Sequence, residues 1–358
     1  AHRRFGPGRQ RLAAFARDRD RRVQRHRDAP RPRLGQHRQR RELQQRGADA
    51  HAEWNEQFEK WAEANPENKQ LFDRLFAREL PADLTADMPT WEAGESIATR
   101  KASEASLQAL GAAMPELWGG SADLAGSTNT IIKGSPSFGP EAITTRKFTA
   151  EPGGRNLHFG IREHAMSAIM NGIALHGNTR VYGGTFLIFS EYQYPAVRLG
   201  SLMSTDTYYV WTHDSIGLGE DGPTHQPVET LSALRAIPNL SVIRPADANE
   251  TAQAWAAALE YKAAPKGLAL SRQGLPVLEG TKEKAHDGVR RGAYVLVEKS
   301  KETPEVILLA TGSEVQLAVA AAKELEAAGT ATRVVSAPCL EWFDEQDDAY
   351  RESVLPSK

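Results

Sequence analysis

The chain has 358 residues, enough for two domains with hydrophobic cores, and its net charge of −2 with 25% charged residues is typical of a soluble globular protein. No apolar run reaches the ~20 residues that span a bilayer, and the basic N-terminus lacks the apolar core of a signal peptide. The single cysteine, Cys339, cannot form an intrachain disulfide, which fits a reducing compartment. These features argue against a membrane protein and favour a cytoplasmic one.

Residues 1–49 differ in composition from the rest of the chain. Residues 1–50 contain sixteen arginines, no lysine and five acidic residues, a net charge of +11, so the other 308 residues carry −13. Few of these residues are aliphatic, so the segment can bury little apolar surface against the entropy of the chain. We predict a disordered tail or an aberrant translation of upstream sequence. A nucleic-acid-binding arm is the alternative, which the lack of helical charge spacing disfavours.

From residue 50 to residue 95 the sequence predicts a helical linker. Trp54, Phe58 and Trp61 recur at helical spacing, and their helix should end before Pro66. A second short helix should follow, and residues 81–95 should be irregular.

Residues 96–275 alternate short apolar strands with helices, which predicts an α/β domain with a mainly parallel sheet and helices on both faces. We expect strands at residues 117–124, 156–159, 179–185, 208–212, 241–244 and 268–271, the first of which should run into a Gly-Gly turn. We expect helices at residues 98–112, 163–176, 189–202, 228–235 and 248–261. Residues 276–290 are predicted to be a connector, and residues 291–358 a second α/β domain that is incomplete.

Glu163 is a candidate catalytic residue because it begins a predicted helix directly after a strand, in the sequence Gly-Ile-Arg-Glu-His-Ala. Ligands of open parallel sheets bind where strands end and helices begin. A carboxyl group in an apolar cleft at that edge keeps its proton more readily and could hydrogen-bond a ring nitrogen. The alternative is a first-turn Glu that the helix dipole favours.

Phe186, Phe189 and Tyr192 lie three residues apart across a predicted strand–helix junction. Such rings could form a flat apolar slot for an aromatic heterocycle. The preceding glycine pair, Gly183 and Gly184, would let a ligand approach the backbone closely. Ordinary core packing is the alternative interpretation of this aromatic stripe.

The loop Gly217-Leu-Gly-Glu-Asp-Gly222 matches the pattern G-x-G-x-x-G, but we reject a dinucleotide site. Glu220 and Asp221 would repel a pyrophosphate, and a proline follows the loop in place of a helix. Together with His213 and His225, the loop suits a polyhydroxylated substrate, because carboxylates accept from hydroxyl groups and histidines donate protons. The histidines lack the compact spacing of zinc ligands, which disfavours a metal site.

Arg100 and Arg272 each flank a predicted α/β element, and a guanidinium fork suits phosphate oxygens. Ser127, which follows the glycine-rich segment Gly119-Gly-Ser-Ala-Asp-Leu124, could add a hydroxyl group to the same phosphate. Taken singly, each arginine is better interpreted as a surface charge.

As a set, these motifs resemble transketolase, a thiamine diphosphate enzyme, from about residue 50 to the C-terminal end. The resemblance is carried by Ala-Thr-Arg-Lys, Gly-Gly-Ser-Ala-Asp-Leu, Gly-Ile-Arg-Glu-His, Gly-Thr-Phe, His-Asp-Ser-Ile-Gly-Leu-Gly-Glu-Asp-Gly-Pro-Thr-His-Gln-Pro and Ser-Arg-Gln. It implies the pyrimidine-binding domain of that family at residues 96–275 and part of its C-terminal domain at residues 291–358. The full enzyme transfers a two-carbon ketol unit from a ketose phosphate to an aldose phosphate in the pentose phosphate pathway.

The resemblance also implies roles for the candidate residues. Glu163 would hydrogen-bond N1′ of the cofactor's pyrimidine ring and so promote loss of the thiazolium C2 proton. The pyrimidine ring would lie among Phe186, Phe189 and Tyr192, and Asp123 would support the cofactor. His213 would take part in catalysis. The sugar phosphate would be bound by Arg100, Ser127, His213, Asp221, His225 and Arg272.

Transketolases also contain a domain that binds the diphosphate and a divalent cation, such as Mg²⁺, through a Gly-Asp-Gly…Asn motif. Nothing in residues 1–50 resembles this motif, so we expect the metal ligands outside this chain and expect the chain alone to be inactive. The resemblance implies a homodimer in the complete enzyme, with the cofactor between two subunits. A smaller departure is that Asn does not directly follow Ser127.

Other interpretations remain open at this point. Dihydroxyacetone synthase shares the fold and the cofactor and uses formaldehyde as acceptor, and other thiamine diphosphate enzymes share the domain. A truncated, non-catalytic protein is an alternative of a different class. An assay of the chain alone and in a mixture with a diphosphate-binding domain would separate these interpretations.

Overall fold

The computed structural model describes residues 34–82, 84–298 and 303–357. The chain divides into two units, Ala1–Phe72 and Asp73–Lys358. Among the described helices, none is long and apolar enough to cross a membrane.

The first unit contains the long helix α2 (Leu34–Ala64), which begins inside the segment for which composition predicts disorder. That prediction is wrong for residues 34–49, and residues 1–33 lie outside the described residues. The helix forms because Arg, Gln, Glu and Ala have good helix propensity and because side chains four residues apart form pairs. Arg38 Nε lies 2.9 Å from Glu42 Oε1, and Gln45 donates to Asp49 at 2.8 Å.

Aromatic side chains follow one side of α2 at the predicted spacing. The ring centroids of Trp54 and Phe58 are 4.9 Å apart, and those of Phe58 and Trp61 are 5.5 Å apart. Phe72, on the next helix α3 (Pro66–Phe76), packs against Phe58 at 5.1 Å. The two helices are therefore joined by a small cluster of partly exposed aromatic rings.

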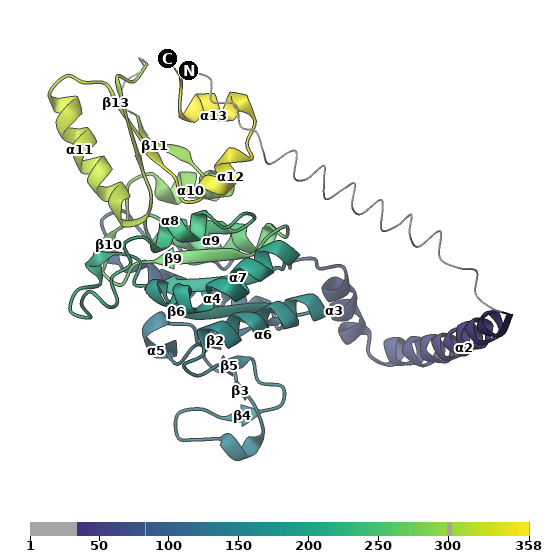
Figure 1. Ribbon diagram of the computed structural model, residues 1–358. Coiled ribbons are helices and arrows are strands. Elements are labelled where there is room, and N and C mark those ends of the chain that lie inside the picture. Colours follow the sequence, from purple (N-terminus) through teal and green to yellow (C-terminus); the bar gives the residue numbers. More distant parts are fainter. Residues whose placement is uncertain (1–33, 83, 299–302, 358) are drawn as a thin grey trace. The chain divides into compact units, whose positions relative to one another are not determined.

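The second unit is built on a sheet of eight parallel strands in the order β4-β3-β5-β2-β6-β7-β9-β8 (Figure 1). This confirms the predicted parallel sheet. The strands are β2 (Leu117–Ser121), β3 (Ser137–Phe138), β4 (Ala150–Glu151), β5 (Asn156–His158), β6 (Arg180–Phe186), β7 (Thr207–Thr212), β8 (Ser241–Ile243) and β9 (Lys266–Leu270). The helices of this part are α4 (Thr99–Ala113), α5 (Ala125–Thr128), α6 (Glu163–His176), α7 (Ser190–Met203), α8 (Thr230–Arg235) and α9 (Ala248–Glu260).

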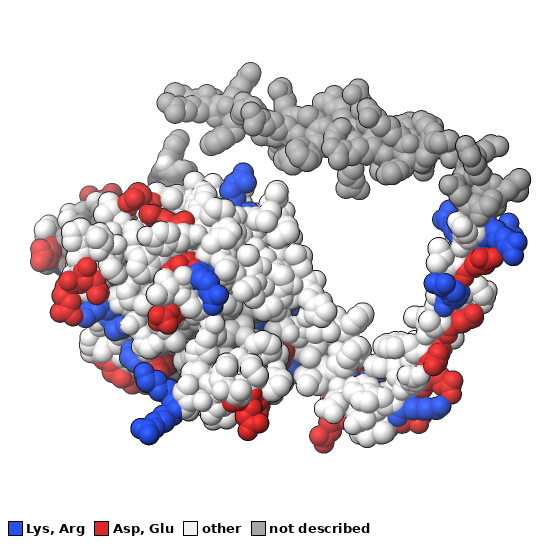
Figure 2. Space-filling model, turned by 60° about the horizontal axis from the view of Figure 1, so that its bottom comes forward, with Lys and Arg blue, Asp and Glu red and all other residues white. Residues whose placement is uncertain are grey.

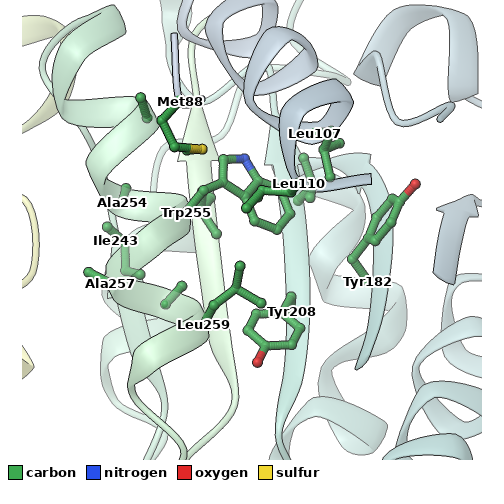
Figure 3. Packing of buried hydrophobic residues seen from close by; sticks show 14 of the residues in the cluster. Met88, Leu107, Leu110, Tyr182, Tyr208, Ile243, Ala254, Trp255, Ala257 and Leu259 are labelled. Carbon is green, nitrogen blue, oxygen red and sulfur yellow. The ribbon is translucent and has the colours of Figure 1, made fainter. Parts of the chain in front are cut away.

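Helices cover both faces of this sheet. Tyr208 of β7 belongs to a core with Trp255 of α9 and Leu107 of α4 (Figure 3). The next residue, Tyr209, points to the opposite face and belongs to a second core with Met166 of α6. Every residue of β6 and β7 is buried, as expected for central strands that are covered on both faces.

Gly119 and Gly120 lie inside β2 and not in the turn that the sequence predicts after it. A Cβ atom at Gly120 would overlap the carbonyl group of Leu157 on β5, and one at Gly119 would overlap Tyr182 on β6. The glycine pair belongs to the strand because its neighbours leave no room for side chains there. The chain turns later, at Asp123, whose φ of 64° is in the left-handed region.

A separate three-stranded sheet lies nearer the C-terminal end, in the order β11-β13-β12. In it, β13 (Thr332–Ser336) is antiparallel to β11 (Tyr294–Glu298) and parallel to β12 (Val306–Ala310). The helices of this part are α11 (Val315–Ala327), α12 (Leu340–Asp344) and α13 (Asp348–Val354).

The connector predicted at residues 276–290 is mostly helical. Helix α10 (Thr281–Arg290) packs against α9 and buries Ala285 and Val289, which are four residues apart. Before it, β10 (Leu275–Pro276) pairs with β1 (Ser96–Ile97). The sequence does carry a signal for this helix, because the apolar residues Ala285 and Val289 are at helical spacing. The prediction of a connector did not use this signal.

Buried polar contacts join the two sheets. Arg244, which follows β8, donates from Nε to Asp214 at 2.7 Å and also contacts Ser313 and Glu314, which follow β12. Because one guanidinium group satisfies acceptors from both parts, this contact fixes the second sheet against the first.

Glu250, in the first turn of α9, is a fully buried carboxyl group that also reaches the second sheet. It accepts hydrogen bonds from Ala246 N at 2.7 Å, from the Tyr294 hydroxyl at 2.8 Å and from the Ser336 hydroxyl at 2.5 Å. Burial, with a further contribution from Asp247, raises the pKa of Glu250 to about 7, although these hydrogen bonds oppose the rise. The folded protein therefore holds a proton at Glu250 more tightly than the unfolded chain does.

We expect Glu250→Gln to gain stability relative to the parent as the pH rises. The protonated carboxyl group stabilises the fold fully below its ordinary pKa of 4.5, and this contribution is lost as the pH rises to about 7, at about 1.4 kcal/mol per pKa unit. Gln keeps an acceptor for Ala246 N, and the two hydroxyl groups can turn to accept from its amide. Urea-unfolding midpoints across this pH range measure the effect. Exposed Glu324→Gln is the control, and identical pH profiles for the parent and Glu250→Gln would contradict the assignment.

Candidate active site

The candidate residues gather at one edge of the eight-stranded sheet. Asp123 follows β2, Glu163 opens α6 after β5, Phe186 ends β6, His213 follows β7 and Arg272 follows β9. Because neighbouring strands run parallel, their carboxyl ends lie along the same edge. The topology thus brings together side chains from five separate parts of the sequence.

A cavity of about 440 Å³ opens beside Glu163 at this edge. Glu163 is the first residue of α6 and is 9% exposed, so its carboxyl group lies in a largely apolar surrounding at the positive end of a helix. Ile161, an exposed apolar residue that also lines the cavity, was not singled out from the sequence. Its position in the same motif, two residues before Glu163, could have indicated it. The lining residues are Ala122, Asp123, Leu124, Ile161, Glu163, Phe189 and Tyr192.

The three predicted aromatic rings form one stack, but only two of them line this cavity. Phe189 and Tyr192 do so, with ring centroids 5.8 Å apart. Phe186 is not part of the lining: it stacks on Phe189 at 5.7 Å and on His213 at 3.7 Å. His225 meets Phe189 edge-on at 5.2 Å. The aromatic stack therefore connects the cavity to the two histidines.

Arg100 and Arg272 come close together although they are far apart in the sequence. Arg100 is the second residue of α4, and its Nη1 donates to the carbonyl oxygen of Ser127 at 2.7 Å. Burial and the charge of Arg272 lower the pKa of Arg100, and Asp221 opposes this. Arg272 Nη2 lies 3.1 Å from Glu220 Oε1. Two cations that repel each other at a partly buried site favour an anion between them. The Ser127 contact uses its carbonyl group, so the role of its hydroxyl group stays a prediction.

His213 lies between the aromatic stack and the arginines. Its φ of 60° is in the left-handed region, and its Nδ1 is 2.9 Å from the Thr212 hydroxyl. Burial, with further contributions from Arg100 and Arg272, lowers the pKa of His213 to about 4, although Asp221 opposes this shift. His213 is therefore neutral at pH 7, with one ring nitrogen as donor and the other as acceptor.

A larger cavity, of about 950 Å³, shares Asp123 with the first. Its lining includes Lys147, His158 and Arg162, which sequence reasoning did not single out. His158 Nε2 is 2.8 Å from Ser137 Oγ. The only sequence signal for this group is that His158 and Arg162 flank Gly160, at the start of the motif that contains Glu163.

Two protein-family models match the chain. The one described as "Transketolase, pyrimidine binding domain" matches residues 95–277, and the one described as "Transketolase-like TK C-terminal domain" matches residues 292–358. The chain belongs to the transketolase family. The cavity beside Glu163 lies in the part that matches the pyrimidine-binding domain.

Curated relatives and solved structures agree on the family. The transketolase of Mycobacterium tuberculosis is 61% identical over 318 residues, and that of Geobacillus stearothermophilus is 49% identical over 314 residues. These matches cover 87% and 88% of this chain but only 45% and 46% of the relatives, so the chain spans about half of their length. A Pichia stipitis transketolase in complex with sedoheptulose 7-phosphate is 45% identical, with a TM-score of 0.81 over 86% of this chain and 45% of that one. A split-gene transketolase, described as an inactive beta4 tetramer, is 27% identical, with a TM-score of 0.54 over 68% of this chain and 72% of that one.

We expect the two charged neighbours of His213 to move its pKa in opposite directions. Arg272→Gln removes a cation that disfavours the imidazolium ion, so the pKa of His213 should rise from about 4. Asp221→Asn removes an anion that favours the imidazolium ion, so the pKa of His213 should fall. NMR titration of the imidazole Cε1–H signals measures both shifts, with exposed His286 as an internal control. Shifts of the same sign would show that a local rearrangement, and not these charges, moves the pKa.

Proposed function

We propose that this chain is the pyrimidine-binding and C-terminal part of a transketolase that depends on thiamine diphosphate. The complete enzyme would transfer a two-carbon ketol unit from a ketose phosphate to an aldose phosphate, as in the pentose phosphate pathway. The observation that supports this most is the cavity in which buried Glu163 lies with the Phe189 and Tyr192 rings. The aromatic stack connects this cavity to a pair of arginines, so one site suits both a flat heterocycle and a sugar phosphate.

The cavity fits the aminopyrimidine ring of the cofactor. Its aromatic residues, Phe189 and Tyr192, suit a flat ring, and its volume of about 440 Å³ has room for one small heterocycle. The Glu163 carboxyl group would hold a proton or a hydrogen bond at N1′ of that ring. Phe186 would support Phe189 from the stack, and Asp123 would support the cofactor. When bound, thiamine diphosphate supplies the electron sink that cleavage of a carbon–carbon bond requires.

The arginine pair would bind the phosphate group of the sugar. Arg100 and Arg272 can offer forked donors to phosphate oxygens, and the Ser127 hydroxyl would add a third contact. His213, Asp221 and His225 would bind the sugar's hydroxyl groups. Neutral His213 can donate a hydrogen bond there without adding charge. The complex of the Pichia stipitis relative with sedoheptulose 7-phosphate supports a sugar phosphate as the substrate class.

A divalent cation such as Mg²⁺, and the donors for the diphosphate, would come from a domain outside this chain. In the part of the chain that the structure describes, no group of three or more His, Cys, Asp or Glu side chains is arranged to hold a metal ion. The split-gene neighbour, of which this chain covers 72%, is described as an inactive beta4 tetramer. We therefore expect the present chain to be inactive alone and to gain ketol-transfer activity when a diphosphate-binding domain is added.

The outer surface of α6 and α7 is the interface that we propose for a homodimer. Ile169 and Leu175 on α6, and Leu199 and Leu202 on α7, are exposed apolar side chains on two helices that pack together. Figure 2 shows a face of the molecule on which charged side chains are sparse over a broad area. Exposed apolar side chains that lie on two neighbouring helices are typical of an interface.

In the enzyme completed with a diphosphate-binding domain, we expect Glu163→Gln to lower kcat by about 10²–10⁴-fold, the range for loss of an acid–base group. Gln can donate a hydrogen bond to N1′ but cannot transfer a proton. Arg272→Ala is the comparison: it should raise the KM for the sugar phosphate and change kcat much less. Steady-state ketol transfer, with deuterium uptake at C2 of the bound cofactor, measures both variants. If Glu163→Gln exchanged the C2 proton as fast as the parent, the role assigned to Glu163 would be wrong.

We expect Leu202→Glu to reduce self-association of the purified chain, because it places a charge in the proposed interface. Leu202 is 75% exposed, so the substitution should leave the fold intact. Sedimentation velocity over a range of concentrations measures the effect. Leu317→Glu, at a leucine on α11 that is 63% exposed, is the matched control and should not change association. Equal association of the two variants would refute this interface.

A further inference from the structure

Three buried polar side chains lie between α6, α7 and the sheet, and we call them the α6–α7 polar cluster: Ser167, Gln193 and Tyr209. Ser167 Oγ on α6 donates to Gln193 Oε1 on α7 at 2.7 Å, and both side chains are fully buried. Burial raises the pKa of Tyr209 to about 12. The hydroxyl groups of Thr207 and Ser167 oppose this rise, although neither forms a hydrogen bond of good geometry with Tyr209.

The cluster lies about one helical turn from the cavity beside Glu163. Ser167 follows Glu163 by four residues on α6. Gln193 is in the first turn of α7, four residues after Phe189, which ends the short 3-10 helix η2 (Leu187–Phe189). Residues four apart lie on the same face of a helix, about 6 Å along its axis. The Ser167–Gln193 hydrogen bond therefore joins the helix that begins at Glu163 to the helix that begins after Phe189.

The cluster is not fully satisfied, which argues against a purely stabilising role. Within the described residues, Gln193 Nε2 and the Tyr209 hydroxyl have no hydrogen-bond partner, and the same holds for the buried hydroxyl of Ser190, three residues before Gln193. A buried polar group without a partner lowers the stability of the fold. An apolar side chain of the same length at position 193 would avoid this penalty.

A second hydrogen bond between the same helices provides a matched comparison. Asn171, on α6 and four residues beyond Ser167, donates from Nδ2 to the carbonyl oxygen of Ala196 on α7 at 2.8 Å. Its Oδ1 accepts from the Thr205 hydroxyl at 3.2 Å. Both ends of the Asn171 amide are thus satisfied, and Asn171 is one turn further from the cavity than Ser167.

We propose that Gln193, through its hydrogen bond with Ser167, is a positioning residue that fixes the Glu163 carboxyl group relative to the Phe189 ring. The proposal rests on the function proposed above, in which these two side chains hold the pyrimidine ring. The apolar contacts of α6 with the sheet are made largely by Met166 and Met170, whose flexible side chains tolerate small shifts of the helix. A buried hydrogen bond has a defined length and direction and selects one of these arrangements.

The test compares Gln193→Met with Asn171→Ala in the purified 358-residue chain. Gln193→Met keeps the length of the side chain and removes its hydrogen bonds, and Ser167 can then bond a carbonyl group of its own helix. Asn171→Ala removes the other hydrogen bond between the helices. Two quantities are measured: the urea midpoint of unfolding, and the Kd for 4-amino-5-hydroxymethyl-2-methylpyrimidine, the pyrimidine half of thiamine, by ligand-observed NMR.

We expect Gln193→Met to weaken probe binding about tenfold, because a misplaced Glu163 carboxyl group would lose one hydrogen bond to the probe. The unfolding midpoint should be equal to or above that of the parent. Asn171→Ala should lower the midpoint and leave the Kd within about twofold. Equal Kd values for the parent and Gln193→Met would overturn the positioning role. So would a fall of the midpoint in Gln193→Met as large as in Asn171→Ala. If the parent chain does not bind the probe, the proposed function fails at this cavity and the inference fails with it.

Discussion

The parallel direction of eight neighbouring strands is the constraint on which the candidate site depends. In such a sheet all strands end at one edge, so the segments after β2, β5, β6, β7 and β9 become neighbours. The arrangement also requires close packing at the centre of the sheet, and glycines make it possible. A Cβ atom at Gly120 would overlap the carbonyl group of Leu157, and one at Gly183 would overlap the sulfur atom of Met170 on α6. Without Gly120 the β2 and β5 strands could not pair as they do, and without Gly183 the Met170 side chain of α6 would have to move.

At the carboxyl ends of the strands, the candidate site has an apolar part and a charged part. On one side, a largely apolar cavity with aromatic residues surrounds the Glu163 carboxyl group, and on the other Arg100 and Arg272 lie near the carboxylates of Glu220 and Asp221. His213 lies at the boundary, stacked on Phe186 and held neutral by burial and by the arginines. A neutral imidazole at this place adds no third positive charge to those of Arg100 and Arg272. The same geometry supports the proposal that one chain provides contacts both to a heterocycle and to a sugar phosphate.

Features that depend on local sequence could be predicted, and features that depend on packing between distant segments could not. The pattern of residues around Glu163 places it at the start of a helix, and the structure has α6 begin there, because a strand, a glycine and a first-turn acid are all local signals. Sequence spacing could not tell that Phe186 stacks on His213 and is absent from the cavity lining, since that depends on how β6 and β7 align. The helical residues 34–49 were missed because composition reports the lack of a core, whereas a single exposed helix needs only propensity and pairs such as Arg38 with Glu42. The hydrogen bond between Ser167 and Gln193 could not be predicted for the same reason, because it depends on how α6 and α7 pack together.

The position of the pyrimidine ring in the bound state tests the central claim most directly. In the chain completed with a diphosphate-binding domain and loaded with thiamine diphosphate, intermolecular NOEs can be measured between the 2-methyl protons of the pyrimidine and individually assigned phenylalanine rings. NOEs to Phe189, in the cavity beside Glu163, are the expected result. NOEs to Phe148, which lines the larger cavity, with none to Phe189, would place the pyrimidine elsewhere and contradict the claim.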